Sequence, residues 1–205
     1  MGFGAALRTE RLVAIVRGRD AEASFRTVMT LVEEGVPLVE VSLSGTDALH
    51  VIGRARKELG DTAWLGAGTV LTAEDAQRAA DAGANLMATP GLGAGVGESV
   101  RQGLPVLAGV ISPTEVIAAD AAGASALKLF PGSIGGPAYL RALRAPFPDL
   151  PFVPVGGVDA AAAGEYLASG AVAVGVGSPL VGDAADGGDL DALRRRAAEF
   201  KAVCA

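Results

Sequence analysis

The sequence contains very few of the side chains that build metal centres and disulfides. Its 205 residues include one cysteine, Cys204, and one histidine, His50. A single cysteine permits no internal disulfide and no cysteine-based metal cluster. His50 falls in a predicted helix, where we expect it to be a solvated surface residue. A histidine metal site and a Ser-His-Asp triad are therefore poorly supported.

Runs of basic residues and long uninterrupted apolar runs are also missing. The net charge is −6, and the absence of a basic run argues against a nucleic-acid partner. Mean hydropathy is high, at +0.40, but the longest uncharged run, residues 166–182, is broken by glycines and by Pro179. That run is barely long enough to span a bilayer. Residues 1–11 lack a secretory-signal pattern. We therefore expect a soluble cytoplasmic protein that does not insert into a membrane.

The composition is that of a globular protein. Hydrophobic residues make up 50% of the chain and charged residues 20%, which is incompatible with extensive disorder. A chain of this length can form one sizeable core. No linker or low-complexity segment divides it, so we expect residues 1–205 to form a single domain.

A weak repeat runs through the sequence, in which glycine follows a helix-like stretch and precedes a short apolar strand. It occurs at Gly35, Gly83, Gly103, Gly123 and Gly170. Glycine just past a helix end adopts the left-handed conformation that stops the helix. Some of these glycines lie 20 residues apart, and the wider gaps of 48 and 47 residues each fit about two units. One strand and one helix per unit is typical of a βα repeat.

The apolar segments predict eight strands. They lie near Leu12–Val16, Leu38–Leu43, Trp64–Ala67, Asn85–Ala88, Pro105–Ala108, Ser125–Phe130, Phe152–Val155 and Val172–Gly175. Continuous apolar strands alternating with amphipathic stretches indicate a parallel sheet covered by helices. Eight such units at this length predict an α/β fold, a (β/α)8 TIM barrel near the short end of its size range. A doubly wound open sheet is the alternative, and it would need a reversal in strand order that sequence cannot show.

Several helices are predicted between these strands. Amphipathic stretches cover Ala21–Glu34, Ala73–Ala82 and Pro113–Ala122. The last two are preceded by hydroxyl residues suited to N-caps, each with an acidic capping-box partner three residues later. These pairs are Thr72 with Asp75 and Ser112 with Glu115. Near the end of the chain, residues 183–191 are predicted as a loop and residues 190–203 as a closing helix.

Two ionisable residues lie inside the predicted core strands. In residues 126–131, alternation puts Ala126, Lys128 and Phe130 on one face of the strand. An unpaired buried charge is costly, so such a lysine loses its proton or finds a carboxylate. Glu40, within another apolar strand, is a candidate partner. Together they form a plausible Schiff-base nucleophile and general acid/base. The alternative is a structural ion pair, which we rank lower because such pairs stabilise weakly.

Further candidates follow the ends of the predicted strands, where TIM barrels carry their active sites. Gly156 and Gly157 follow the seventh strand, and Gly177 and Ser178 follow the eighth. Phosphate sites in this fold are often built from these two loops, so a phosphorylated substrate is favoured. Thr69 and Arg17 are candidates to hold a carboxylate or phosphate, although either could be an ordinary loop residue. Pro90, Phe130 and Val155 occupy further strand ends as candidate substrate contacts.

With these residues in place, the chain resembles the 2-keto-3-deoxy-6-phosphogluconate and -phosphogalactonate aldolases, a class I family. The resemblance covers about Leu12 to Leu180. Each motif is moderately specific, and their order and spacing together are highly specific. The motifs are residues 39–43 (VEVSL), 66–70 (GAGTV), 89–92 (TPGL), 127–131 (LKLFP), 155–158 (VGGV) and 176–178 (VGS).

The resemblance implies a trimeric TIM barrel that needs no metal or other cofactor. It implies Lys128 as the Schiff-base lysine and Glu40 as the acid/base. Thr69 would bind the pyruvate carboxylate, and the glycines after strands seven and eight would bind the phosphate. The partner is then a phosphorylated keto-deoxy sugar acid, cleaved into pyruvate and glyceraldehyde 3-phosphate.

Departures from the phosphogluconate branch favour the phosphogalactonate substrate. That branch typically has arginine where Ser44 stands and threonine where Val155 stands. The phosphogalactonate branch is more similar at Arg17-Gly18, at Val155 and at residues 136–139. Two other functions remain open on the residues alone. One is a phosphosugar isomerase or epimerase without a covalent step, and the other is a non-catalytic phosphosugar-binding barrel. Whether Lys128 forms an adduct discriminates both from the aldolase.

Overall fold

The computed structural model describes residues 2–205, and Met1 lies outside the described residues. Within this range, eight strands form one parallel sheet in the order β7-β6-β5-β4-β3-β2-β1-β8. The strands are β1 (Leu12–Val16), β2 (Leu38–Ser42), β3 (Trp64–Gly68), β4 (Leu86–Ala88), β5 (Val106–Val110), β6 (Ala126–Leu129), β7 (Phe152–Pro154) and β8 (Val174–Val176). The helices are α1 (Phe3–Glu10), α2 (Ala21–Glu33), α3 (Ala48–Leu59), α4 (Ala73–Asp81), α5 (Ala94–Arg101), α6 (Pro113–Ala121), α7 (Gly136–Arg144), α8 (Ala160–Ala168), α9 (Ser178–Val181), the 3-10 helix η1 (Ala184–Asp186) and α10 (Leu190–Cys204).

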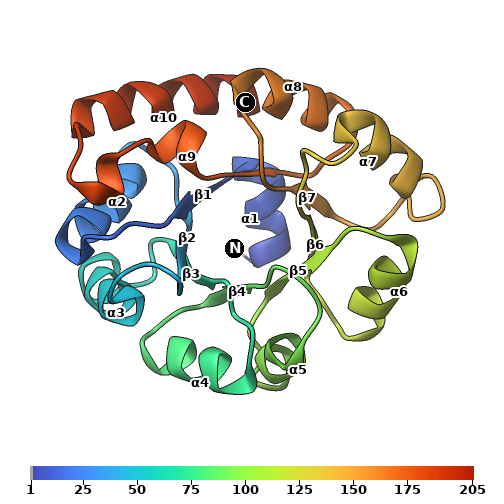
Figure 1. Ribbon diagram of the computed structural model, residues 1–205, viewed down its shortest axis with the longest axis horizontal. Helices are drawn as coiled ribbons and strands as arrows, with labels where there is room; N and C mark the ends of the chain where they lie inside the picture. Colours follow the sequence, from blue (N-terminus) through green and yellow to red (C-terminus); the bar gives the residue numbers. More distant parts are fainter. Residues whose placement is uncertain (1) are drawn as a thin grey trace.

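The sheet curls into a nearly closed barrel. Each strand from β1 to β7 pairs with its neighbour in sequence, and β8 pairs with β1. The remaining seam, between β7 and β8, is bridged at Val155 and Gly175. Viewed down its shortest axis, the molecule is a ring of strands inside a ring of helices (Figure 1). The predicted TIM barrel is therefore confirmed, and the doubly wound alternative is wrong because the strand order contains no reversal.

Strand alternation divides the apolar side chains into two clusters. Leu127 and Leu129 of β6 belong to the cluster between barrel and helices. Ala126 belongs to the cluster inside the barrel, where Phe130 packs against it. This is the division predicted for residues 126–131, and it puts Lys128 on the inner face. Side chains that point inward near the carboxyl ends of the strands therefore share one small volume.

The helices begin where local chemistry favours them. Thr72 with Asp75, and Ser112 with Glu115, form reciprocal capping boxes at the starts of α4 and α6, as predicted. The closing helix α10 also begins at the predicted residue, after an N-cap at Asp189. His50 lies exposed on α3, as expected. Residues 183–191 contain the short η1, which the sequence pattern did not predict.

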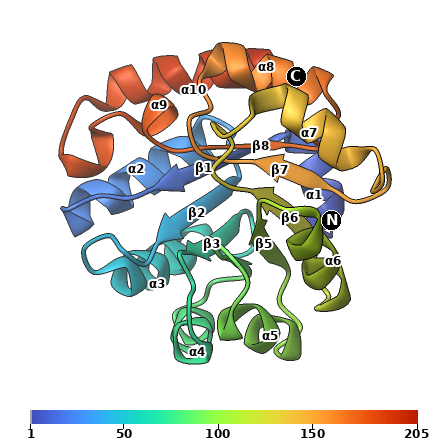
Figure 2. The same ribbon diagram turned by 45° about the vertical axis from the view of Figure 1, so that its right-hand side comes forward.

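Helix α1 was not predicted either, and it determines which end of the barrel is open. Its apolar residues Phe3, Ala6 and Leu7 pack into the cluster inside the barrel. The Phe3 ring meets Trp64, at the start of β3, edge to face with 5.3 Å between centroids. Figure 2 shows α1 across one end of the strands. Because the amino ends of the strands are covered in this way, access to the interior is from the carboxyl ends.

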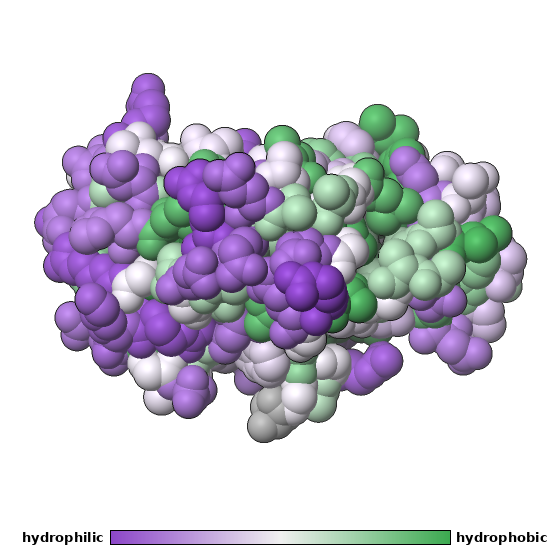
Figure 3. All heavy atoms as spheres, turned by 90° about the horizontal axis from the view of Figure 1, so that it is seen from below, coloured by the Kyte–Doolittle hydropathy of each residue, from purple (hydrophilic) through white to green (hydrophobic). Residues whose placement is uncertain are grey.

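The surface is unevenly apolar. Figure 3 shows the side that carries α4 and α5, with hydrophilic residues toward α3 and hydrophobic residues toward α6. Among residues 2–205, the large exposed apolar side chains are Leu71, Leu92, Ile117 and Ile134. Three of them lie in loops after β3, β4 and β6, and Ile117 lies on α6. Within residues 2–205, none of the helices has the length and apolar content needed to cross a membrane.

Candidate active site

Lys128 and Glu40 meet inside the barrel. They belong to β6 and β2, which stand four places apart in the eight-stranded order and so face each other across the barrel. Lys128 Nζ lies 3.3 Å from Glu40 Oε1 and 3.4 Å from Oε2. The two side chains are only 7% and 3% exposed. The sequence suggested this pair from two separate strands, and the fold brings the two residues into contact.

Glycine on neighbouring strands makes room for these side chains. A Cβ atom at Gly68 of β3 would lie 1.9 Å from Glu40 Oε1. On β5, Gly109 is the register partner of Lys128, and a Cβ atom there would lie 2.2 Å from the Pro90 backbone carbon. Any larger residue at either position would displace the carboxylate or the loop after β4. The glycines in these strands are therefore requirements of the site.

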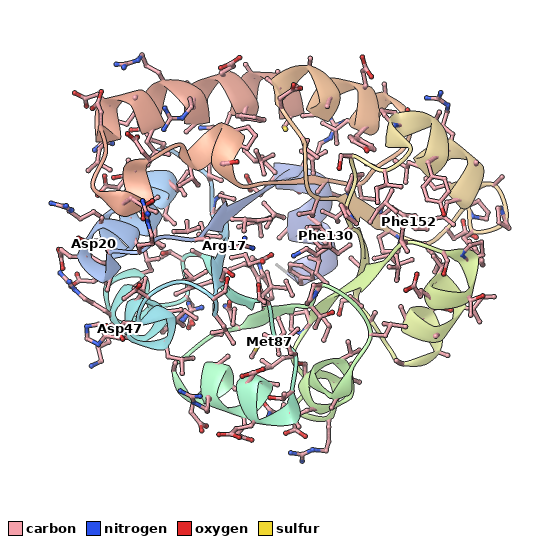
Figure 4. All side chains as sticks on the ribbon, viewed as in Figure 1. Arg17, Asp20, Asp47, Met87, Phe130 and Phe152 are labelled. Atoms are coloured by element: carbon pink, nitrogen blue, oxygen red, sulfur yellow. The ribbon has the colours of Figure 1, made fainter. Side chains whose placement is uncertain are left out.

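A hollow of about 300 Å³ opens beside the pair, between the ends of β1, β6, β7 and β8. It brings together seven of the residues singled out in the sequence: Arg17, Phe130, Val155, Gly156, Gly157, Gly177 and Ser178. Phe130 connects the hollow to the ion pair, since Lys128 Nζ lies 5.8 Å from the centroid of its ring. In Figure 4, Arg17 and Phe130 project into the middle of the ring from opposite sides.

Thr69 and Pro90 do not line this hollow. Pro90 is half-buried in the loop after β4, against Gly109. Thr69 belongs to a cluster of hydroxyl groups at the end of β2: Ser42 Oγ lies 2.9 Å from Thr69 Oγ1 and 2.9 Å from Ser44 Oγ. Arg17 Nε donates to the same Ser42 oxygen over 3.4 Å. Arg17 therefore joins the hydroxyl cluster to the hollow.

Thr69 has an unusual backbone conformation. Its φ is +60°, in the left-handed region where a β-branched residue is an outlier. Left-handed backbone costs an ordinary residue roughly 1–2 kcal/mol, so the surrounding contacts must hold it there. Ser42 supplies one of these contacts. Such outliers are concentrated at functional sites.

The loops after β6 and β7 are tied together, and sequence analysis missed three of the residues involved, Gly132, Ser133 and Tyr166. Gly132 N–H donates to the Val155 carbonyl over 2.7 Å, and Ser133 N–H donates to the Gly156 carbonyl over 3.0 Å. Tyr166 on α8 donates its hydroxyl to the Gly132 carbonyl over 2.5 Å. Burial raises the pKa of the Tyr166 phenol, which keeps this donor protonated. A tyrosine in a helix carries no sequence signal for such a role.

Residues suited to metal binding do not gather at this site. Across residues 2–205, no group of three or more histidine, cysteine, aspartate and glutamate side chains is arranged to hold a metal ion. The chemical groups at hand are an amine, a carboxylate, a guanidinium, hydroxyl groups and loop N–H groups. An amine paired with one carboxylate inside an apolar barrel can act as a nucleophile with an adjacent acid/base.

Comparison with known proteins gives consistent matches over nearly the whole chain. A family model described as KDPG and KHG aldolase matches residues 4–195. The chain is 39% identical over 181 residues to a probable 2-dehydro-3-deoxy-6-phosphogalactonate aldolase of Rhizobium meliloti, covering 87% of this chain and 85% of the relative. It is 35% identical over 178 residues to a 2-dehydro-3-deoxy-phosphogluconate aldolase of Treponema pallidum, covering 86% and 84%. A solved structure named native KDPGal superposes with a TM-score of 0.88 at 32% identity, covering 94% of this chain and 93% of that one.

Proposed function

The chain belongs to the KDPG and KHG aldolase family, and we propose that it is a class I aldolase. Its substrate is a 2-keto-3-deoxy-6-phospho sugar acid, and its products are pyruvate and glyceraldehyde 3-phosphate. The observation that carries this proposal is the contact between Lys128 Nζ and the Glu40 carboxylate inside the barrel. Both 2-dehydro-3-deoxy relatives are named as aldolases.

The pair suits a covalent cleavage. Transfer of a proton from Lys128 to Glu40 frees the nitrogen lone pair, which attacks the C2 ketone of the substrate. The C2 oxygen takes one proton from the attacking nitrogen and one back from Glu40 and leaves as water. This leaves an iminium ion, which is an electron sink next to C3, and restores the Glu40 carboxylate. Glu40, directly or through a water, removes the C4 hydroxyl proton, and the C3–C4 bond breaks to release the aldehyde. The enamine left on Lys128 is reprotonated at C3 and hydrolysed to pyruvate.

The substrate's two anionic ends have separate places. The phosphate binds the loops after β7 and β8, where Gly156, Gly157, Gly177 and Ser178 line the hollow. Gly156 and Gly157 have φ of +94° and +72°, which glycine adopts without strain and which lets backbone N–H groups approach phosphate oxygens. The carboxylate binds near Thr69. Pro90 and Phe130 contact the carbon chain.

The preferred substrate is the phosphogalactonate epimer, which differs from the phosphogluconate epimer only at C4. Support comes from Val155, which is buried and lines the hollow. Its backbone N–H and carbonyl are both bonded, to Leu129 and Gly132, and its side chain has neither donor nor acceptor. Val155 therefore offers no hydrogen bond to a C4 hydroxyl, whereas a threonine there could.

We infer that the enzyme is a cytoplasmic homotrimer. The resemblance to the family suggests this assembly, and the exposed apolar side chains support it. Ile117, Ile134 and Leu71 are 60%, 59% and 55% exposed. Exposing such large apolar side chains to water is unfavourable, and a second copy of the chain that covered them would remove this cost.

The Schiff base can be tested directly because the chain contains only three lysines, Lys57, Lys128 and Lys201. With pyruvate and borohydride, we expect an irreversible mass gain of one three-carbon unit per chain, located on Lys128 by peptide mapping. Lys57→Ala and Lys201→Ala should still be modified, and Lys128→Ala should not. An unmodified wild type would rule out the covalent mechanism and favour an isomerase, an epimerase or a binding protein.

A further inference from the structure

Ser42 is the centre of the hydroxyl cluster at the barrel mouth. It is fully buried, and its Oγ has three polar partners: Ser44 Oγ and Thr69 Oγ1 at 2.9 Å, and Arg17 Nε at 3.4 Å. The Ser42 side chain itself has no surface from which to contact bulk water. Any effect that it has on a ligand must pass through these three neighbours.

The hydrogen-bonding capacity of Ser42 fixes what its neighbours can offer. A hydroxyl group donates one hydrogen bond and accepts two. Arg17 Nε can only donate, so it takes one acceptor position of Ser42. Ser42 then has its own proton and one lone pair left. It donates the proton to either Ser44 or Thr69 and accepts a hydrogen bond from the other. Whichever of the two accepts from Ser42 keeps its own O–H free, so the cluster presents one free hydroxyl donor.

The cluster also leaves most of a guanidinium unpaired. Arginine carries five N–H donors, and among residues 2–205 the Nε–H bond to Ser42 is the only side-chain hydrogen bond of Arg17. No carboxylate in that range forms an ion pair with it. One free O–H beside an unpaired guanidinium is a set of donors suited to an anion such as a carboxylate.

The position of the cluster matches the first carbon of a 2-keto acid bound to Lys128. Ser42 follows Glu40 by two residues on the same face of β2, about 6.6 Å further along the strand. A keto acid joined at C2 to Lys128 Nζ carries its carboxylate oxygens about 3 Å from that nitrogen. Donors to those oxygens lie about 3 Å further away. Glu40, which contacts Lys128, and the hydroxyl cluster around Ser42 are thus spaced for the ketone and the carboxylate of one molecule.

The left-handed backbone at Thr69 is a second sign that Ser42 has a positioning role. A β-branched residue at φ +60° is held there only if its surroundings fix it. The hydrogen bond between Ser42 Oγ and Thr69 Oγ1 restrains the Thr69 side chain in this conformation. Without Ser42, both the orientation of the Thr69 hydroxyl and that of Arg17 are released.

We propose that Ser42 is a positioning residue for the substrate's C1 carboxylate. It donates its proton to Thr69 Oγ1, which leaves the Thr69 O–H free, and it holds Arg17, so that the Thr69 hydroxyl and the Arg17 guanidinium both point at that group. The inference rests on the proposed aldolase function and concerns its carboxylate site. Neutral analogues that keep the ketone react with Lys128 without help from Ser42.

The test compares borohydride trapping by pyruvate with trapping by pyruvamide, in which a neutral amide of the same shape replaces the carboxylate. In Ser42→Ala, we expect the half-saturating pyruvate concentration to rise at least about 10-fold, equivalent to about 1.4 kcal/mol. The value for pyruvamide should change less than about 2-fold. Ser42→Thr keeps the hydroxyl group and should restore pyruvate trapping.

Controls separate positioning from a general loss of packing. Ser99→Ala removes another fully buried serine hydroxyl, which donates to Gly95 within α5, and should leave both ketones unaffected. Adding Thr69→Val to Ser42→Ala should cost little more, because residues that act as one unit are not additive. If Ser42→Ala does not fold, Ser42→Cys, which keeps the volume but bonds weakly, must give the same selective loss.

Two results would overturn the inference, and they differ from a failure of the proposed function. A wild type that is trapped on Lys128, with Ser42 variants in which pyruvate and pyruvamide change equally, would leave the aldolase standing and remove the role of Ser42. A wild type that neither ketone modifies would overturn the aldolase and the role of Ser42 together.

Discussion

Single residues create the chemistry of this barrel by interrupting an apolar interior. A buried ion pair contributes little net stability, because desolvation offsets the attraction between its charges. The Lys128–Glu40 distances of 3.3 and 3.4 Å are also longer than the 2.7–2.9 Å of a strong charge-assisted bond. This geometry is not optimised for stability. It leaves the amine nitrogen available to a ligand atom, as a nucleophile requires.

Val155 carries the prediction about substrate preference. A buried hydroxyl left unpaired costs about 1–3 kcal/mol, which corresponds to about 5- to 150-fold. We expect wild-type kcat/KM to favour the phosphogalactonate substrate over the phosphogluconate epimer. Val155→Thr, which has almost the same shape, should shift the ratio toward phosphogluconate by up to that factor. The measurement is kcat/KM for both epimers in both proteins.

This prediction has a clear contrary result. Val153 lies two residues earlier on the same inner face of β7 and is fully buried, so Val153→Thr is a matched control that should not change the epimer ratio. A wild type that already prefers the phosphogluconate substrate would contradict the proposal. If Val155→Thr shifts the ratio of kcat/KM values away from phosphogluconate, Val155 does not set the substrate preference and serves only to pack the barrel.

Strands and helices position the site through the loops at the carboxyl ends of the strands, and the loops after β7 and β8 are those we propose to bind the phosphate. Gly157 is a poor position to probe. A side chain there would require φ +72°, and its Cβ would lie 2.9 Å from Ser133 Cβ. Ser178 starts α9, is exposed and lines the hollow, so a larger side chain there can extend into solvent.

We expect Ser178→Asp to raise KM for the phosphorylated substrate by about 10- to 100-fold, or about 1.4–2.8 kcal/mol, because it adds a negative charge beside a dianion. Ser178→Asn has the same size without the charge and should have a much smaller effect. Steady-state kinetics should also include an unphosphorylated 2-keto-4-hydroxy acid, whose KM should stay near wild type. Equal increases for both substrates would place the phosphate elsewhere.

The sequence predicted the elements well because their signals are local. A continuous apolar run, a glycine after a helix or a capping box depends on a few neighbouring residues, and all eight strands lie within a few residues of their predicted bounds. Helix α1 was missed because its pattern becomes meaningful only against the end of a closed barrel. Arg17 and Thr69 were singled out, but Ser42, which joins them, was missed for the same reason: the three residues come from different strand ends, and a serine in a strand is unremarkable by itself.

The whole molecule has two unlike ends. Helix α1 closes the amino ends of the strands with Phe3, Ala6 and Leu7, and the carboxyl ends carry the hollow and the hydroxyl cluster. Three exposed apolar side chains, Leu71, Leu92 and Ile134, stand in loops on this open side. The charged helix α10 lies on another side of the ring, beside α8 and α2 (Figure 1). Association through the surface that carries Leu71, Leu92 and Ile134 would therefore occur close to the site, whereas α10 would face solvent.

This arrangement leads to a prediction about assembly. Light scattering in solution should give a mass about three times the 20.4 kDa of one chain. Fully burying one isoleucine side chain is worth about 1.5–3 kcal/mol, and a charge in its place adds a desolvation cost. Ile117→Glu and Ile134→Glu should therefore shift the population toward monomer at micromolar concentration.

Ala198→Glu, at an exposed position of α10, adds the same charge away from the exposed isoleucines and should leave the mass unchanged. A wild-type mass of 20.4 kDa would contradict the trimer. A trimer that persists in both isoleucine variants would instead show that the subunits meet through another face.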